Sequence, residues 1–265
     1  MRLIITVITI FLSVGSVFSQ IMLGPKVSAL YQTYNHEDKS KFKDRDITTD
    51  FDWGYNAGIV MIYRAQKKIG LQIEVLYASK NRKLSGGIED EFSHEANYRY
   101  LEGAINFKYY FPRKTFTGYV YSGGRFSHWL SGKGEIYSYE FDESNTDASV
   151  YKILFDANDL DDEEGDIFIL EPNRIQVGLD FGVGAMINTL HSKNKVMVDL
   201  GVQYGHSWLA RDHDILVGVD EYREDFRASS ISLAMSVSYL FRMDIGQGRE
   251  GKSTSKVGSK KKRKK

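Results

Sequence analysis

The chain has 265 residues, of which 42% are hydrophobic and 13% aromatic, and its 35 basic and 35 acidic side chains cancel in formal charge. This content is too apolar for a chain that is disordered throughout, and the length allows one large domain or two small ones. There is no cysteine, which excludes structural disulfides, thiolate zinc sites, cysteine nucleophiles and a lipoprotein anchor.

The first 19 residues have the pattern of an export signal. Arg2 supplies a positive start, the next ten residues are apolar except for two threonines, and Val17 and Ser19 occupy the small-residue positions of a signal-peptidase site. We therefore expect a signal peptide at 1–19. The apolar run is shorter than the ~20 residues that a spanning helix needs, so a retained helical anchor is not expected.

Alternation of apolar and polar side chains continues along most of the chain. Successive side chains of a strand point to opposite faces, so a membrane β-barrel alternates lipid-facing apolar residues with small or polar lumen-facing ones. The pattern is strictest at Ile175–Ile187, Val196–Trp208 and Ile231–Phe241. Five segments follow it less strictly, near 21–33, 51–64, 69–82, 98–111 and 116–131. Each of these eight segments is long enough for a tilted membrane strand of ~9–11 residues.

The connections between these segments alternate in length. Short links near 66–68, 112–114 and 190–194 alternate with long polar links near 34–50, 83–97, 132–173 and 210–228. Outer-membrane barrels have short periplasmic turns and long external loops, whereas the links of a soluble sandwich or lipocalin need not alternate. We therefore predict an all-β fold over 20–241, an eight-stranded antiparallel up-and-down transmembrane β-barrel in the bacterial outer membrane. Aromatic residues near the strand ends suit its interfaces.

Seven charged residues fall on inward-facing positions of the predicted strands. An eight-stranded barrel is just wide enough for side chains to fill it, and charges buried in so narrow a lumen must pair or hydrogen-bond. We expect three cations to meet four carboxylates in a network that fills the lumen, and the surplus carboxylate could bind a cation or hold a proton. The members are Lys26, Glu74, Glu102, Lys108, Arg125, Asp180 and Asp199.

The longest predicted link is strongly acidic. Thirteen of residues 135–171 are acidic and one is basic. Oxygen-rich clusters suit calcium, and Asp159, Asp161 and Glu163 fill the first odd positions of an EF-hand loop. The glycine that this loop requires comes one place too late, at Gly165. We therefore expect a solvated external loop with one candidate calcium site, and no cofactor.

Residues 242–265 form a Lys-rich C-terminal tail. The strand pattern stops at Phe241, and the tail carries ten basic residues against two acidic ones. We expect it to be disordered and, by the parity of eight strands, periplasmic. An exported chain meets no nucleic acid there, so a periplasmic protein, the cell wall or anionic lipid is the expected target. The docking residues are Lys260, Lys261, Lys262, Arg263, Lys264 and Lys265.

No arrangement of residues predicts a catalytic site. His206 and Ser207 are neighbours in a predicted strand and point to opposite faces, which argues against a His–Ser pair. Asp212 and His213 lie in an external loop where they could activate water, but a second acidic pair is missing. We therefore expect no enzymatic activity.

Several predicted strands carry short motifs in a consistent order. They are Gly24–Ser28, Gly54–Gly58, Leu71–Ala78, Tyr100–Glu102, Lys108–Phe111 and Tyr119–Ser131. Together these motifs resemble the PorT-like outer-membrane β-barrel domain common in Bacteroidota, over roughly residues 21–241. The resemblance implies the barrel fold, and members of that family are implicated in type IX secretion and gliding. The acidic loop and the basic tail depart from the family's usual pattern.

Three functions remain open at this point. The first is a non-catalytic outer-membrane barrel that anchors or organises envelope machinery, linked to protein secretion, with its basic tail docking a periplasmic partner. The second is a narrow pore or cation-conducting barrel. The third is a surface enzyme or adhesin that acts through the external loops. The narrow lumen favours the first.

Overall fold

The computed structural model describes the strands and most of their short connections. Its described residues are 20–36, 47–86, 92–138, 149–155, 167–168, 172–189, 194–210, 215–216, 223–224 and 227–243. The expected signal peptide, the candidate calcium residues and the Lys-rich docking residues lie outside these ranges. Within them, no helix has both the length and the apolar character needed to cross a membrane.

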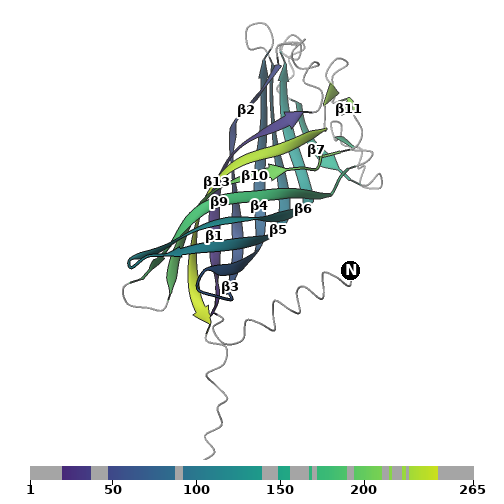
Figure 1. Cartoon of the computed structure of the whole chain (residues 1–265). Coiled ribbons are helices and arrows are strands. Elements are labelled where there is room, and N and C mark those ends of the chain that lie inside the picture. Colours follow the sequence, from purple (N-terminus) through teal and green to yellow (C-terminus); the bar gives the residue numbers. More distant parts are fainter. Residues whose placement is uncertain are drawn as a thin grey trace, which may run out of the picture.

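Eight long antiparallel strands close into a ring (Figure 1). They are β1 (Gln20–His36), β3 (Asp52–Arg64), β4 (Ile69–Gly86), β5 (Phe92–Pro112), β6 (Phe116–Ser138), β9 (Ile175–Asn188), β10 (Lys195–Gly205) and β13 (Ala228–Met243). Each pairs with the next one in this order. The ring closes where β1 pairs with β13. The predicted all-β, eight-stranded up-and-down barrel is confirmed, and every predicted segment is one of its strands.

Five short strands lie near one end of the barrel. They are β2 (Ile47–Asp50), β7 (Ser149–Leu154), β8 (Ile167–Phe168), β11 (Ile215–Leu216) and β12 (Arg223–Glu224). Three of them extend the barrel sheet, since β2 pairs with β4, β7 with β6 and β8 with β7. The long connections leave the barrel here, so we call this the long-link end. The opposite end, where short links join the strands, is the short-turn end.

Three strands run further at the long-link end than the sequence predicted. The link expected at 83–97 is wrong, because β4 and β5 stay paired as far as Gly86 and Phe92. In this extension the outward residues are polar, and Lys83 lies 2.6 Å from Glu95 across the strands. The apolar–polar rhythm therefore disappears beyond the lipid while the inward side chains remain buried. Likewise β6 runs to Ser138, into the expected 132–173 link.

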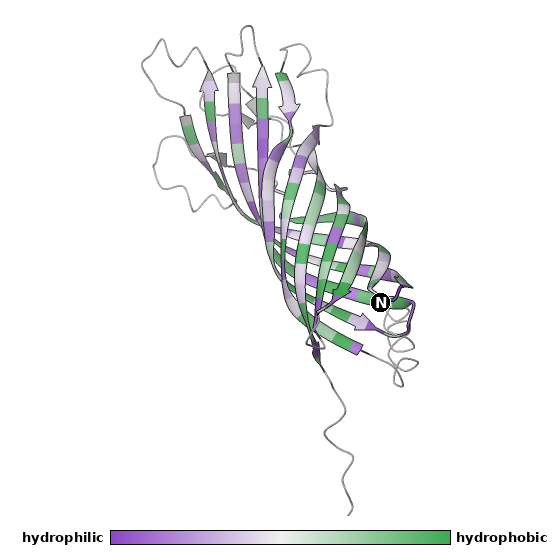
Figure 2. Ribbon diagram, turned by 90° about the vertical axis from the view of Figure 1, so that its left-hand side faces the viewer, coloured by the Kyte–Doolittle hydropathy of each residue, from purple (hydrophilic) through white to green (hydrophobic). Residues whose placement is uncertain are grey.

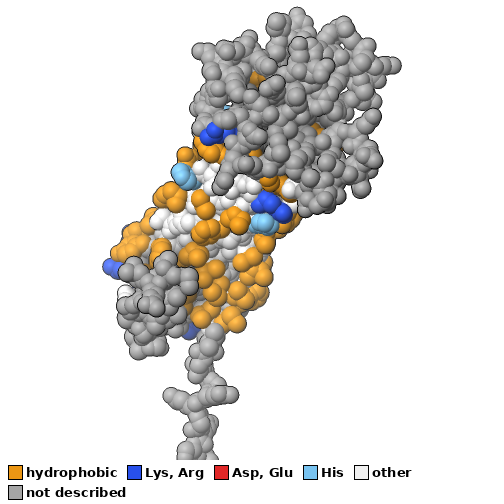
Figure 3. Space-filling model, turned by 90° about the vertical axis from the view of Figure 1, so that its right-hand side faces the viewer, with side chains coloured by type: hydrophobic (Ala, Val, Ile, Leu, Met, Phe, Trp, Pro, Cys, Tyr) orange, Lys and Arg blue, Asp and Glu red, His pale blue; other side chains and the backbone are white. Residues whose placement is uncertain are grey.

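The outer wall below this extension is apolar. Figure 2 shows green hydrophobic residues concentrated in the lower half of the barrel, and Figure 3 shows the same region as an orange belt. Outward residues such as Val27, Ile59 and Phe107 are more than half exposed. A continuous exposed apolar surface of this size is stable against lipid and not against water. Exposed aromatic residues border it, at Tyr31, Trp53, Tyr55 and Tyr77 above and at Tyr109, Phe111, Tyr239 and Phe241 below.

Two adjacent glycines on β6 face opposite sides of this wall. A Cβ atom at lumen-facing Gly123 would overlap the Ile105 carbonyl and lie 2.7 Å from the Asn106 Cα atom, whereas one at lipid-facing Gly124 would meet no atom within 4 Å. We expect Gly123→Ala to destabilise the barrel by about 1–3 kcal/mol, because backbone must shift, and Gly124→Ala to have no such effect. Urea unfolding in detergent measures both. Equal losses would contradict the assigned facing.

Candidate functional site

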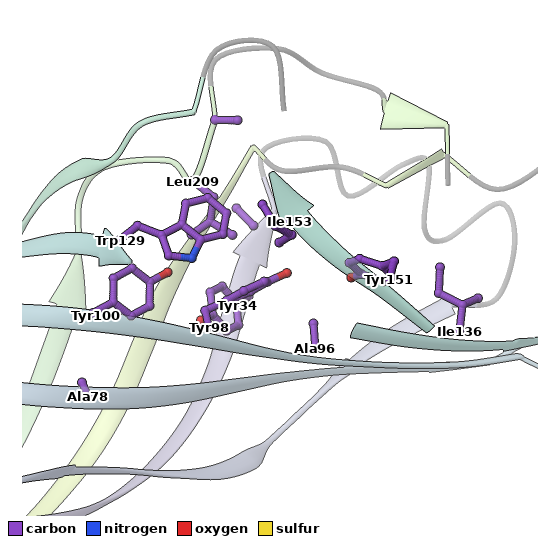
Figure 4. Close-up of a cluster of buried hydrophobic side chains, with 12 residues drawn as sticks. Tyr34, Ala78, Ala96, Tyr98, Tyr100, Trp129, Ile136, Tyr151, Ile153 and Leu209 are labelled. Carbon is purple, nitrogen blue, oxygen red and sulfur yellow. The ribbon is translucent and has the colours of Figure 1, made fainter. Parts of the chain in front are cut away.

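Layers of side chains fill the barrel from end to end. An apolar cluster at the short-turn end comprises Met22, Val60, Ile62, Tyr110, Tyr119, Met186, Met197 and Leu240. A second cluster at the long-link end comprises Tyr34, Ala78, Ala96, Tyr98, Tyr100, Trp129, Ile136, Tyr151, Ile153, Leu209, Ala210 and Ala228 (Figure 4). The predicted charged residues occupy intermediate positions along the strands. The charged layer thus lies between two apolar ones.

Trp129 is the centre of the cluster at the long-link end. Its ring meets that of Tyr98 edge-on at 5.2 Å and lies 6.2 Å from the stacked ring of Tyr100, centroid to centroid. Phe155 packs against it at 5.0 Å. The indole Nε1 donates a hydrogen bond to the Ser131 carbonyl at 3.0 Å, so the polar atom of this buried side chain is satisfied. The aromatic groups therefore fill this end of the lumen as a packed core.

Arg125 is the centre of the charged layer. Its Nη1 donates to Glu102 Oε2 at 2.6 Å, and its Nε and Nη2 donate to the two carboxylate oxygens of Asp180 at 3.0 and 2.7 Å. Its Nη2 also lies 4.0 Å from Glu74 Oε2. The paired side chains are almost fully buried. The planar guanidinium uses its fork of donors here, which a lysine could not reproduce.

Lys26 and Lys108 complete the set expected from the sequence. Lys26 Nζ lies 2.5 Å from Glu74 Oε1 and 3.9 Å from Asp199 Oδ2. Lys108 Nζ lies 3.7 Å from Asp199 Oδ1 and sits over the Tyr119 ring, 3.7 Å from its centroid. The structure therefore brings all seven of those side chains into one connected group.

Lys80 is an eighth member, which the sequence analysis missed. Its Nζ lies 2.7 Å from Glu102 Oε1, and both side chains are buried. The signal was present, because Lys80 has the same strand parity as Glu74 on β4. With Lys80 the group holds four cations and four carboxylates. The carboxylate that the sequence analysis counted as surplus is therefore balanced in formal charge by Lys80.

Hydroxyl and amide groups donate further hydrogen bonds to these carboxylates, although Glu74 Oε2 is buried without one and has Arg125 Nη2 at 4.0 Å. Ser127 Oγ donates to Glu102 at 3.1 Å, and Ser236 Oγ donates to Asp199 at 3.2 Å. The Tyr119 hydroxyl also donates to Asp199, and the Gln72 amide donates to Glu74. A buried ion pair is tolerated when its geometry is good and its other lone pairs are used. This arrangement is suited to holding the charges in place.

Of the other residues considered from the sequence, His206 and Ser207 are described, and they serve the backbone pairing of β9 and β10. Ser207 Oγ accepts a hydrogen bond from the Val177 amide at 2.9 Å, and the amides of His206 and Ser207 both donate to the Val177 carbonyl. These contacts end the β9–β10 pairing. The part of the chain that the structure describes holds no group of three or more His, Asp or Glu placed to bind a metal. Asp212 and His213 fall outside it.

Polar contacts also hold the extension beyond the lipid. His94 Nε2 lies 2.6 Å from the Tyr151 hydroxyl, which ties β5 to β7. Burial, together with the positive charge of Arg82, holds the pKa of His94 well below its usual range. On the outer face the hydrogen bond from Lys83 to Glu95, and the charge of that carboxylate, raise the pKa of Lys83. The extension is thus held together by ion pairs and hydrogen bonds as well as by strand pairing.

Two lysines of β4 test what burial contributes to these pairs. Lys80 pairs with buried Glu102, and Lys83 pairs with largely exposed Glu95 at a similar distance. We expect Lys80→Met to destabilise the barrel by about 3 kcal/mol, since it leaves a buried carboxylate with one cation fewer. Lys83→Met should cost less than about 1 kcal/mol, because water screens the pair. Reversible urea unfolding in detergent compares them; similar losses would refute the assigned burial.

The chain matches one protein family and is similar to several solved outer-membrane proteins. The family described as "Outer membrane protein beta-barrel domain" matches residues 18–208. OprG from Pseudomonas aeruginosa is 11% identical over 85% of this chain and 96% of its own, with a TM-score of 0.42. The E. coli outer membrane protein W is 14% identical over 82% and 98%, with a TM-score of 0.32. Ail of Yersinia pestis, solved in complex with the heparin analogue sucrose octasulfate, is 12% identical over 84% and 99%, with a TM-score of 0.35. No curated protein matches.

Proposed function

Since the chain belongs to the outer membrane protein β-barrel domain family, we propose that it is a non-catalytic barrel that anchors or organises envelope machinery. Its class, a small outer-membrane β-barrel protein, follows from the family and the ring of eight strands. The filled lumen is the observation that supports an anchoring or organising role. A barrel without a free interior acts through its rims, loops and appended segments.

The filled lumen supports anchoring over conduction. An ion entering from the long-link end would meet Trp129 and Tyr98, and one entering from the short-turn end would meet Met197, all three fully buried. Between them it would have to separate Arg125 from its carboxylates. Each pair that opens leaves uncompensated buried charge, which costs several kcal/mol. A path built for ions would instead leave a continuous row of solvated ligands.

The link to protein secretion rests on the PorT-like motifs. Five of the charged lumen residues stand within those motifs, namely Lys26, Glu74, Glu102, Lys108 and Arg125. In the structure they are members of the central charge group. The resemblance thus includes side chains that pair with one another inside the lumen. This supports a barrel scaffold shared with the PorT-like family, from which we infer that this protein serves secretion machinery.

The basic tail is the proposed docking element for a periplasmic partner. The last barrel strand ends at Met243, and the six consecutive basic residues Lys260–Lys265 follow it. An even number of strands places the two ends of a barrel on the same side as the short periplasmic turns. Concentrated positive charge there favours a partner with an acidic surface.

Reconstitution in planar bilayers tests the role of the lumen. We expect no steady ionic current from the full chain, because both apolar clusters and the paired charges obstruct the interior. A general porin in the same bilayers serves as the positive control. Steady single-channel steps from the wild type, altered by Arg125→Met, would favour the narrow pore instead.

Affinity purification in mild detergent tests the tail. The full chain should retain an acidic periplasmic protein that a chain lacking 246–265 does not, and added salt should release it, since exposed charge pairs are screened. A matched variant replaces the Lys260–Lys265 block with serine while keeping its length. Identical partners for all three chains would remove the docking role.

A further inference from the structure

The short-turn end of the barrel is basic by itself, apart from the tail. The described residues of this end, 20–22, 63–69, 111–116, 187–189, 194–196 and 241–243, include no Asp or Glu. They include seven cations, which we call the basic rim: Arg64, Lys67, Lys68, Arg113, Lys114, Lys195 and Arg242. The long-link end is mixed, with Asp50, Asp52 and Glu95 beside Lys83 and Lys133. The difference in charge between the two ends is therefore a property of the folded barrel itself and does not depend on the tail.

Two tight turns hold four of these cations against the edge of the apolar belt. The Gln66 amide donates to the Ile69 carbonyl at 3.2 Å, and the Arg113 amide donates to the Phe116 carbonyl at 2.9 Å. The cations cannot move far from the membrane because each turn is only a few residues long. Figure 3 shows basic side chains at the lower edge of the orange belt. All four cations of these turns are exposed, namely Lys67, Lys68, Arg113 and Lys114.

Aromatic residues next to these turns mark the level of the lipid headgroups. Tyr109 and Phe111 precede the second turn, are exposed, and pack edge to face at 5.1 Å. Tyrosine rings at a lipid interface lie at headgroup depth. Cations that follow them within a few residues therefore reach the phosphate layer, with their methylene stems along the apolar surface.

The rim also gathers charges of one sign at short range. The Arg64 guanidinium donates to the Lys67 carbonyl at 2.5 Å and lies 4.6 Å from the Tyr110 ring centroid, so it is held in place. Lys195, the first residue of β10, adds a further positive charge at this end. Like charges held together repel one another unless anions collect beside them. A bound anion at this end would relieve that repulsion.

We propose that the basic rim binds the phosphates of anionic phospholipids in the leaflet that the short turns face, the periplasmic leaflet. Lipid fits better than an acidic protein, because the cations ring the edge of the belt at headgroup depth and do not form one projecting patch. Such binding fixes the depth and orientation of the barrel. It is independent of the partner of the tail.

Native mass spectrometry of the full chain tests this proposal. The protein is released from micelles that contain equal amounts of phosphatidylglycerol and phosphatidylethanolamine, and the retained lipids are counted. We expect wild type to prefer phosphatidylglycerol by about fivefold or more, the gain from one cation beside an anionic surface. The rim variant, Lys67→Gln, Lys68→Gln, Arg113→Gln and Lys114→Gln, should lose most of this preference.

Two matched variants separate the rim from charge in general. One replaces four exposed cations of the long-link end, by Arg99→Gln, Lys133→Gln, Lys152→Gln and Arg174→Gln. The other replaces the Lys260–Lys265 block with glutamine. Both should keep the preference, and the heat-shifted gel mobility of a folded barrel checks each chain. The proposal is overturned if wild type shows no preference, if the rim variant keeps it, if only the tail variant loses it, or if the rim variant loses an acidic protein and not lipid.

Discussion

Closure of the sheet is the constraint on which the rest of this protein depends. In hydrocarbon every backbone N–H and C=O must be paired within the protein, and the pairing of β1 with β13 removes the two free edges that would otherwise remain. Closure at eight strands then sets a lumen no wider than the side chains that fill it. The apolar belt, the interfacial aromatics and the crowded interior all follow from that ring.

The narrow lumen in turn dictates how its charges are arranged. The eight charged side chains of the central group lie away from bulk water, so each must face opposite charge. Arg125 joins Glu102 and Asp180, and the lysines balance the remainder. Apolar clusters cover this group at both ends. The interior is therefore filled by packed side chains, as the core of a soluble domain is, with charged side chains at its centre. Since the interior is filled, the two rims are the parts that can meet other molecules. One rim extends as a polar sheet and the other carries only positive charge among its described residues.

Much of the fold was predictable because strand parity is local. The inward direction of a residue such as Asp180 or Asp199 can be inferred from its immediate neighbours in the sequence, without information on distant strands. The extension was not predictable in this way. Beyond the lipid an outward residue such as Asn97 is polar like its surroundings, so the rhythm that reveals a membrane strand is lost. Lys80 was missed at the edge of this region.

The sequence by itself determined that the chain builds an eight-stranded membrane barrel, which side chains point inward, and that the barrel interior carries both signs of charge. Only the tertiary structure decided which charges meet. The pairing of Lys80 with Glu102 joins β4 to β5, and that of Arg125 with Asp180 joins β6 to β9. Such contacts depend on the register of neighbouring strands and on the tilt with which the ring closes. Register is a relation between strands and cannot be found within any one of them.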